Sequence, residues 1–169
     1  YWRLVDPDGR TVFGPRYMNW TDGSSDQDVL MLAKSGSYTL LIEGRYYTTG
    51  TASYTFNVQP VSDDEATLTL DTRVDGGIAH TGQRDLYHFT LTAPTRLYFD
   101  SLTNNSVLSW SLTGPTGTEV AGRSFISSDC YDGTSLFTLP AGDYTLTVDG
   151  SGDATGDYAS VLRNLASAT

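Results

Sequence analysis

The chain is short of lysine, glutamate and cysteine, and each shortage narrows the classes of protein to which it can belong. Lys34 is the only lysine, and 20 acidic residues outnumber 10 basic ones, which gives a formal net charge of −10. Because phosphates and anionic lipids are bound by clustered Lys and Arg, this balance argues against a nucleic-acid partner and against electrostatic docking on membranes. No window approaches the roughly 20 apolar residues of a spanning helix, so we expect no membrane insertion.

Reactive side chains are equally scarce. The single cysteine, Cys130, cannot form an internal disulfide, and neither histidine, His80 or His88, lies near it in the sequence. The sequence has no Gly-x-Ser-x-Gly elbow, no HExxH or CxxC pair and no phosphate-binding glycine loop. A glycosidase would need only two carboxylates, and that alternative stays open. The prediction is nevertheless that the chain is not an enzyme and has no catalytic residue, cofactor-binding residue or assigned metal ligand.

The abundant residues are those of short strands and turns. Serine and threonine total 41 of the 169 residues, with 17 Gly and 11 Tyr, whereas the helix formers Glu, Gln, Lys and Met are few. Apolar residues alternate with polar ones in several short runs that recur every 8–12 residues, as in a sandwich or barrel. The expected strands are 86–91, 97–102, 108–112, the neighbourhood of Val120, 136–139, 144–148 and 158–165. The sequence therefore predicts an all-β fold.

An internal repeat organises the chain. Residues 2–14 match residues 110–122 at six of thirteen positions, and residues 35–44 match residues 141–150 at five of ten. Tyr54 then matches Tyr158 after a two-residue deletion, so the order of the matches is preserved. A fixed order with small gaps is typical of a structural repeat.

The segment 61–108 occurs only once, so the chain consists of a back half (1–60), a front half (61–108) and a second back half (109–169). We predict two domains: 1–60 as the C-terminal part of one β-sandwich repeat, and 61–169 as a complete repeat. In an alternative arrangement, residues 1–60 pair with 61–108 and leave the last third without partners. Because the first residue is Tyr1 rather than Met, we expect the natural protein to extend before it. A back half alone leaves an apolar face uncovered, which either preceding residues or a neighbouring molecule would cover.

The landmark residues resemble a known family. They are Asp85-x-Tyr87-x-Phe89, Leu97-Tyr98-Phe99, Gly114-Pro115-x-Gly117 and Leu139-Pro140-x-Gly142-x-Tyr144-x-Leu146-x-Val148-x-Gly150. Their order and spacing resemble the bacterial pre-peptidase C-terminal domain and related β-sandwich repeats of large secreted or surface proteins. The resemblance covers 66–165 as a whole unit and 1–58 as its latter part. It implies an antiparallel, jelly-roll-like sandwich outside the cytoplasm with no chemistry of its own. Some relatives bind collagen or calcium through leading segments, but this chain lacks the corresponding run of acidic ligands.

The residues are compatible with two kinds of ligand site, one for calcium and one for sugars or protein surfaces. Asp22, Asp26 and Asp28 place three carboxylates within seven residues, and Ca²⁺ prefers oxygen ligands from flexible loops. Their counterparts in the second copy are Asp129 and Asp132, and a further acidic group is Asp149 with Asp153 and Asp157. Each group also reads as a solvated loop with Asx-turns, the interpretation that we favour. Trp20, Tyr17, Tyr46 and Tyr47 could stack on sugars or protein surfaces, although we favour ordinary strand and core roles for them.

The expected function is a non-catalytic repeat module of a large secreted or cell-surface bacterial protein, acting as spacer, adhesin stalk or targeting module. Two alternatives stay open: a self-assembling extracellular fibre subunit completed by strands of neighbouring chains, and a ligand-binding accessory module of a secreted hydrolase that binds polysaccharide or collagen. The expected partners are neighbouring repeats or identical chains, with an extracellular polysaccharide or protein as a further ligand.

Overall fold

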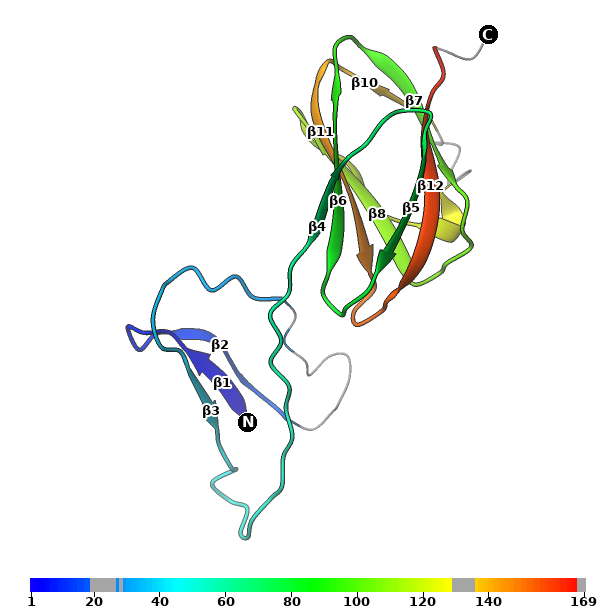
Figure 1. Ribbon diagram of the computed structural model, residues 1–169. Coiled ribbons are helices and arrows are strands. Elements are labelled where there is room, and N and C mark those ends of the chain that lie inside the picture. The colour runs from blue at the N-terminus through cyan, green and yellow to red at the C-terminus, as the bar shows by residue number, and fades with distance from the viewer. Residues whose placement is uncertain (19–26, 28, 129–135, 167–169) are drawn as a thin grey trace. The chain divides into compact units, whose positions relative to one another are not determined.

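The computed structural model describes residues 1–18, 27, 29–128 and 136–166 and shows an all-β protein (Figure 1). The chain divides into two compact parts between Pro60 and Val61, and we call residues 1–60 unit 1 and residues 61–169 unit 2. Within the described residues the only helical segment is a short 3-10 turn, η1 (Phe125–Ser127). The same residues include no helix that is long and apolar enough to cross a membrane.

Unit 2 is built from two sheets. In spatial order, the larger sheet contains β4 (Asp64–Thr67), β6 (Arg84–Leu91), β11 (Gly142–Gly150), β8 (Leu108–Gly114) and β9 (Gly117–Ser124). The smaller sheet contains β10 (Leu136–Leu139), β7 (Thr95–Ser101), β12 (Gly156–Asn164) and β5 (Arg73–Ile78). Every neighbouring pair is antiparallel except β4 and β6. The expectation of a purely antiparallel sandwich is corrected at this edge, because the chain passes from β4 to β5 in the other sheet before returning as β6.

The strand faces follow the alternation in the sequence. In β6, Tyr87, Phe89 and Leu91 are buried while His88 and Thr90 are exposed, as predicted. The same agreement holds in β8 and β11, whose buried side chains are Leu108, Trp110 and Leu112, and Tyr144, Leu146 and Val148. In β7, Leu97 and Phe99 are buried but Ser101 is only half-buried, so the predicted third member of that face is marginal. Strand periodicity of two therefore places one apolar side of each sheet against the other.

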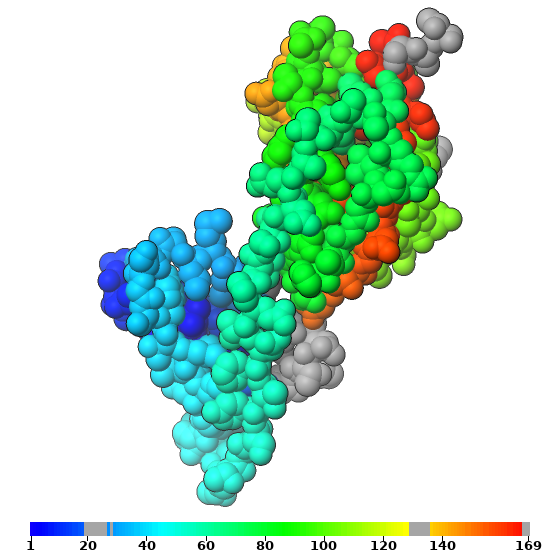
Figure 2. Space-filling model, viewed as in Figure 1, coloured from blue at the N-terminus to red at the C-terminus, as the bar shows by residue number. Residues whose placement is uncertain are grey.

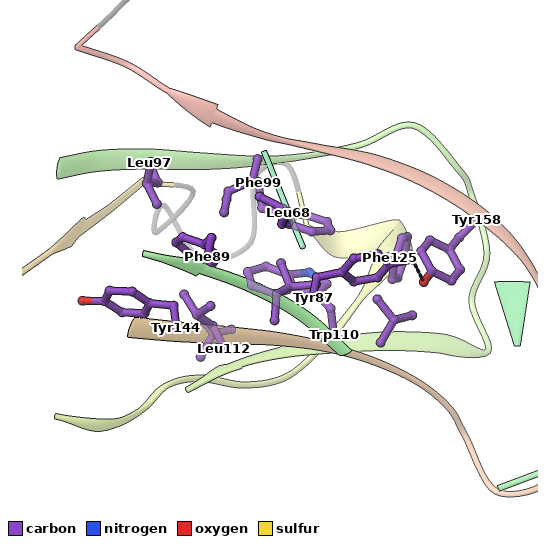
Figure 3. Close-up of a cluster of buried hydrophobic side chains, with 14 of the residues drawn as sticks. Leu68, Tyr87, Phe89, Leu97, Phe99, Trp110, Leu112, Phe125, Tyr144 and Tyr158 are labelled. Atoms are coloured by element: carbon purple, nitrogen blue, oxygen red, sulfur yellow. Dashed lines mark hydrogen bonds between the residues drawn. The ribbon is translucent and has the colours of Figure 1, made fainter. Parts of the chain in front are cut away.

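The core lies between the two sheets and is rich in aromatic rings (Figure 3). Phe99 of the smaller sheet stacks on Trp110 of the larger sheet, with ring centroids 4.1 Å apart and planes inclined by 14°. Phe125 of η1 meets the edge of Phe99 at 5.7 Å and lies 5.3 Å from Tyr158. Aromatic pairs in such geometries contribute about 0.5–1.5 kcal/mol each beyond the area that they bury. No disulfide within the described residues supplements this core, which matches the single cysteine of the sequence.

Unit 1 contains, within its described residues, one three-stranded sheet in the order β2-β1-β3. Its strands are β1 (Trp2–Val5), β2 (Thr11–Arg16) and β3 (Thr39–Ile42). The turn between β1 and β2 is held by Asp6, whose carboxylate accepts hydrogen bonds from the amides of Asp8 and Arg10 at 2.9 and 2.8 Å. Lys34 bridges the carboxylates of Asp6 and Asp8 at 2.5 and 2.7 Å. Gly9, at φ 80°, completes the turn that the Asp-Pro-Asp-Gly sequence predicts.

The register of β1 with β3 in unit 1 matches that of β8 with β11 in unit 2, whereas the register of β1 with β2 is shifted by one residue from that of β8 with β9. Trp2 lies opposite Ile42 and Leu4 opposite Leu40, and at the equivalent places Trp110 lies opposite Val148 and Leu112 opposite Leu146. The order β2-β1-β3 therefore has the arrangement of β9-β8-β11. In unit 2 the front strand β6 pairs with β11, β5 pairs with β12, and β7 pairs with both β10 and β12. The last third of the chain thus has strand partners, contrary to the alternative in which it was left without them.

Candidate functional site

Of the acidic groups singled out as calcium sites, one lies within the described residues. Asp22, Asp26 and Asp28 lie outside the described residues, as do Asp129, Asp132 and Cys130. Asp149, Asp153 and Asp157 are described, and they lie on β11, on the following turn and on β12. Across the described part of the chain, no three His, Cys, Asp or Glu side chains are grouped so that they could hold a metal ion. Asp149, Asp153 and Asp157 therefore do not form a group that could hold a metal ion.

His88 lies in an open groove along β6, β11 and β8. The groove has a volume of about 620 Å³, and its polar lining comes from Thr67, Thr69, His88, Thr90, Thr113, Asp143 and Thr145. Two pairs of these side chains contact each other: Thr90 Oγ1 donates to Asp143 Oδ1 at 2.7 Å, and His88 Nδ1 lies 3.1 Å from Thr145 Oγ1. Such a surface offers hydroxyl, imidazole and carboxylate groups to a polar ligand, but the groove is open and would leave much of the ligand exposed to water.

Thr145, His88 and Glu65 form a line that invites comparison with a catalytic triad. His88 Nε2 lies 3.7 Å from Glu65 Oε2, which is beyond hydrogen-bond distance, and both side chains are about half exposed or more. Thr145 lies in the middle of β11, a strand paired on both sides. The neighbouring amides are therefore engaged in the sheet and cannot stabilise an oxyanion next to the Thr145 hydroxyl. His80, the other histidine, lies in the turn between β5 and β6. Within the part of the chain that the structure describes, neither histidine has the partners of an acid–base catalyst.

A buried polar cluster joins the two sheets at the other end of β6. The Tyr158 hydroxyl donates to Asp85 Oδ2 at 2.5 Å and lies 2.7 Å from the Tyr87 hydroxyl. Gln83 Nε2 donates to Asp85 Oδ1 and to Asp64 Oδ2, each at 3.0 Å. Asp85 is only 4% exposed, so its carboxylate depends on these donors in place of water. The cluster links β4, β6 and β12.

The two tyrosines of this cluster remain protonated. Burial, followed by the hydrogen bonds to Asp85 and Tyr87, raises the pKa of Tyr158 far above its usual range. Burial also raises the pKa of Tyr87, although its hydrogen bond with Tyr158 acts in the opposite direction. A phenol with a raised pKa is a poor general base at neutral pH. Neither phenol is therefore suited to act as a general base at neutral pH.

A second aromatic group surrounds Arg45 in unit 1. The Arg45 guanidinium lies 4.9 Å from the centre of the Tyr17 ring, 5.8 Å from that of Tyr47 and 5.9 Å from that of Tyr1. Arg45 Nη1 also donates to the Tyr47 hydroxyl at 3.0 Å, and the rings of Tyr1 and Tyr17 lie 4.6 Å apart. A hydrogen bond with Tyr17 is the main cause that raises the pKa of Tyr1. We call Tyr1, Tyr17, Arg45 and Tyr47 the arginine–tyrosine cluster.

The structure thus brings together only part of the predicted aromatic set. Tyr17 and Tyr47 join the arginine–tyrosine cluster, Tyr46 is 99% exposed beside Tyr47, and Trp20 lies outside the described residues. Tyr1 and Arg45 were missed from sequence. The repeat contained a signal for the position of Tyr1. The backbone of Tyr1 exchanges two 2.8 Å hydrogen bonds with Glu43. The equivalent residues of unit 2, Ser109 and Asp149, lie opposite each other in the same way.

Solved structures with a similar fold are known. The chain is similar to the pre-peptidase C-terminal domain of a collagenase from Bacillus anthracis, with 18% identity, a TM-score of 0.46, and coverage of 63% of this chain and 100% of that one. The resemblance seen in the landmark residues is confirmed. The chain is also similar to PliG, a periplasmic inhibitor of g-type lysozyme, from Salmonella Typhimurium, with 20% identity, a TM-score of 0.48, and coverage of 60% and 98%. PliG from Aeromonas hydrophila gives 13% identity, a TM-score of 0.47, and coverage of 62% and 99%.

No protein-family model and no curated protein sequence matches the chain. At the identities of the solved structures, the likeness is one of fold. The chain is a β-sandwich protein that resembles the pre-peptidase C-terminal domain and the PliG inhibitors in this respect alone.

Proposed function

We propose that the chain is a non-catalytic repeat module of a large secreted or cell-surface bacterial protein, acting as a spacer, adhesin stalk or targeting module. In this proposal, one complete jelly-roll-like repeat (61–169) follows the latter part of another (1–60). The observation that carries it is the equal register of β1 with β3 and of β8 with β11, in which Trp2–Ile42 and Trp110–Val148 are equivalent pairs. Equal strand pairing at matching sequence positions is expected of tandem repeats.

The chemistry of the described side chains supports a structural role. The buried polar cluster around Asp85 is occupied by its own hydrogen bonds, and the groove around His88 lacks the partners of an acid–base site. The net charge of −10 keeps such a module soluble at high local concentration. A spacer needs stability, solubility and repetition, and these properties are supplied by the sandwich, the charge and the repeat.

The proposal is tested by the mass and location of the natural polypeptide. An antibody raised against unit 2 would be used on fractions of the bacterium that makes the protein, followed by denaturing electrophoresis and mass spectrometry. The proposal expects a polypeptide far heavier than 18.3 kDa, in the medium or on the cell surface, with further peptides that match the repeat. A polypeptide of 18.3 kDa, or one confined to the cytoplasm, would contradict it.

The arginine–tyrosine cluster favours a second candidate function, that of a ligand-binding accessory module for polysaccharide or collagen. Tyr17 is 49% exposed and Tyr47 is 62% exposed, so both offer ring surface on which a sugar or a peptide could stack. Tyr47→Ala should then abolish binding to one member of a panel of polysaccharides and collagens. Tyr54→Ala, an exposed aromatic outside the cluster, is the control. Absence of binding across the panel would remove this candidate.

The half-buried face of unit 1 favours a third candidate, a self-assembling fibre subunit in which neighbouring chains complete each other. In that case the isolated chain would form filaments as its concentration rises. A chain that stays monomeric and fully folded at high concentration would remove this candidate.

A further inference from the structure

The strands present in unit 1 are those whose counterparts in unit 2 pair with other strands of the back half, residues 109–169. In unit 2, β8 pairs with both β9 and β11, and the counterparts β1, β2 and β3 are all present. The strand β10 pairs with β7, and β12 pairs with β5 and β7, so these two strands depend on the front half. By sequence alignment their counterparts in unit 1 are residues 30–33 and 54–58, and neither segment is a strand (Figure 1). The missing strands are thus those whose partners lie in residues 61–108.

Burial shows the same division. Leu112 and Val148 are 1% and 0% exposed in unit 2, whereas their counterparts Leu4 and Ile42 are only half-buried. In the two segments without strand structure the exposure is greater still: Met31 is 91% exposed and Phe56 48%. Figure 2 shows the chain after β3 (cyan) as an extended strip with its side chains at the surface. Alternating apolar side chains of this kind are expected to be buried in a sheet.

The front half supplies the specific partners of unit 2. Trp110 stacks on Phe99 of β7, whereas the ring neighbour of Trp2 is Phe13 of its own sheet, at 4.8 Å. Tyr158 is 3% exposed and bonds to Asp85 and Tyr87 of β6, whereas its counterpart Tyr54 is 58% exposed. The edge of β11 is paired along its length with β6, whereas β3 has β1 as its one strand partner in the described chain.

We propose that unit 1 is a docking surface for a front segment, meaning a polypeptide with the strand pattern of residues 61–108. Its β6-like strand adds to the free edge of β3 and sets an Asp-x-Tyr pair against Tyr54. Its β7-like strand pairs with both 30–33 and 54–58 and lays a phenylalanine ring on Trp2, and its β5-like strand pairs with 54–58. The inference rests on the same repeat as the proposed function, but it concerns what covers unit 1 and does not depend on the length of the natural polypeptide.

The test extends the chain with a copy of its own front half. Because Tyr1 is equivalent to Ser109, residues 61–108 can be joined directly to Tyr1 without an added linker. Hydrogen exchange with mass spectrometry would then be compared between the extended and the original chain. We expect the amides of 30–33, 39–42 and 54–58 to exchange at least ~100-fold more slowly in the extended chain, as in a cooperatively folded sheet. An extended chain in which these amides remain unprotected, whether it is monomeric or aggregated, overturns the proposal.

Two pairs of variants show whether the protection comes from the proposed docking. In the added copy, Phe89→Asp should remove the protection, whereas Thr90→Asp, on the outer face of the same strand, should leave it. In unit 1, Leu40→Asp on the covered face should remove the protection, whereas Leu41→Asp on the exposed face should retain it. If the two substitutions of either pair changed the amide protection equally, the proposed contact through the inner faces of these strands would be contradicted.

The original chain provides the remaining outcome. Sedimentation over a wide concentration range reports whether it self-associates. If the original chain forms dimers or filaments in which the same amides become protected, a second copy of the chain covers unit 1 and the proposal is overturned. This result is distinct from a failure of the proposed function, which would appear as a natural polypeptide of 18.3 kDa.

Discussion

The hydroxyl groups of Tyr87 and Tyr158 lie 2.7 Å apart and join the two sheets of unit 2. Tyr87 belongs to β6 and Tyr158 to β12, so this contact spans the sandwich at a place where both rings are almost fully buried (Figure 3). Tyr158 also donates to Asp85, which makes it the central donor of the buried polar cluster. The stability of the sandwich should therefore respond sharply to changes in this one side chain.

Tyr158→Phe should lower the free energy of unfolding of unit 2 by about 1–3 kcal/mol, because it leaves the buried Asp85 carboxylate without one of its donors. Urea denaturation followed by tryptophan fluorescence measures the change. Tyr46→Phe removes a hydroxyl from a fully exposed side chain and should have no measurable effect. Equal stabilities of the two variants would show that the Tyr158–Asp85 hydrogen bond contributes nothing.

Gly76 of β5 lies against the same two rings, and Gly76→Ala should destabilise unit 2 by about 1–3 kcal/mol through overpacking. A Cβ at this position would lie 2.5 Å from the Tyr158 hydroxyl oxygen and 2.6 Å from that of Tyr87. Gly77→Ala is the matched control, since its Cβ would meet the end of the Asp157 side chain, which can move away. Thermal unfolding should separate the two variants, and the reverse order of stability would contradict this account.

Unit 2 should lose stability at alkaline pH. In the unfolded chain Tyr87 and Tyr158 lose their protons near pH 10, whereas the raised pKa values of the folded state keep both protonated. Above that pH the unfolded state binds fewer protons than the folded state, so the free energy of unfolding falls by at most about 1.4 kcal/mol per pH unit for each tyrosine. Urea denaturation between pH 8 and 11 measures the slope. In Tyr158→Phe the slope should be shallower, and an unchanged slope would show that Tyr158 titrates normally.

Equivalent leucines of the two units should differ in their contribution to stability. Leu112→Ala removes a side chain that is 1% exposed and should cost unit 2 about 2–5 kcal/mol. Leu4→Ala, at the matching position of a half-buried face, should cost unit 1 only about 1–2 kcal/mol, because less apolar area is lost from contact. Hydrogen exchange in increasing urea reports each unit separately. A larger loss for Leu4 would mean that its face is covered in solution.

The sequence predicts the larger part of unit 2 because its strands alternate in the ordinary way. The strands β6, β8 and β11 were all expected, and Tyr87, Trp110 and Leu146 point to the predicted side. The pairing of Trp2 with Ile42 and of Leu4 with Leu40 has the register of Trp110 with Val148 and of Leu112 with Leu146, the positions that the repeat in the sequence relates to one another.

The strands β4 and β5 were not expected. The residues of β4 are exposed and two of the four are acidic, and the strand forms because the ladder of β6 accepts it at an edge. β5 contains two adjacent glycines, which usually disfavour a strand, but the first of them provides the space that Tyr87 and Tyr158 occupy. In both cases the cause lies in a distant part of the chain, so local patterns carry little signal.

The aromatic residues of unit 1 were only partly predicted for a related reason. Tyr17 and Tyr47 were singled out by residue type, but their grouping depends on Arg45, which lies outside β3 and follows no strand alternation. The failure of residues 54–58 to form a strand was also unexpected from their alternation of Tyr54, Phe56 and Val58. Alternation gives a face to bury, but a strand also needs a neighbour to pair with.

The exposed strip of chain after β3 has a consequence for digestion by proteases. Between Arg45 and Arg73 the sequence has no Lys or Arg, so trypsin-like enzymes find no cleavage site in the segment that connects the two units. Tyr54 and Phe56 are exposed in the same segment and provide sites for chymotrypsin-like enzymes. Trypsin, whose sites flanking this segment are Arg45 and Arg73, should therefore leave residues 46–60 attached to unit 2, whereas chymotrypsin should remove most of them and release unit 2 as a shorter resistant core.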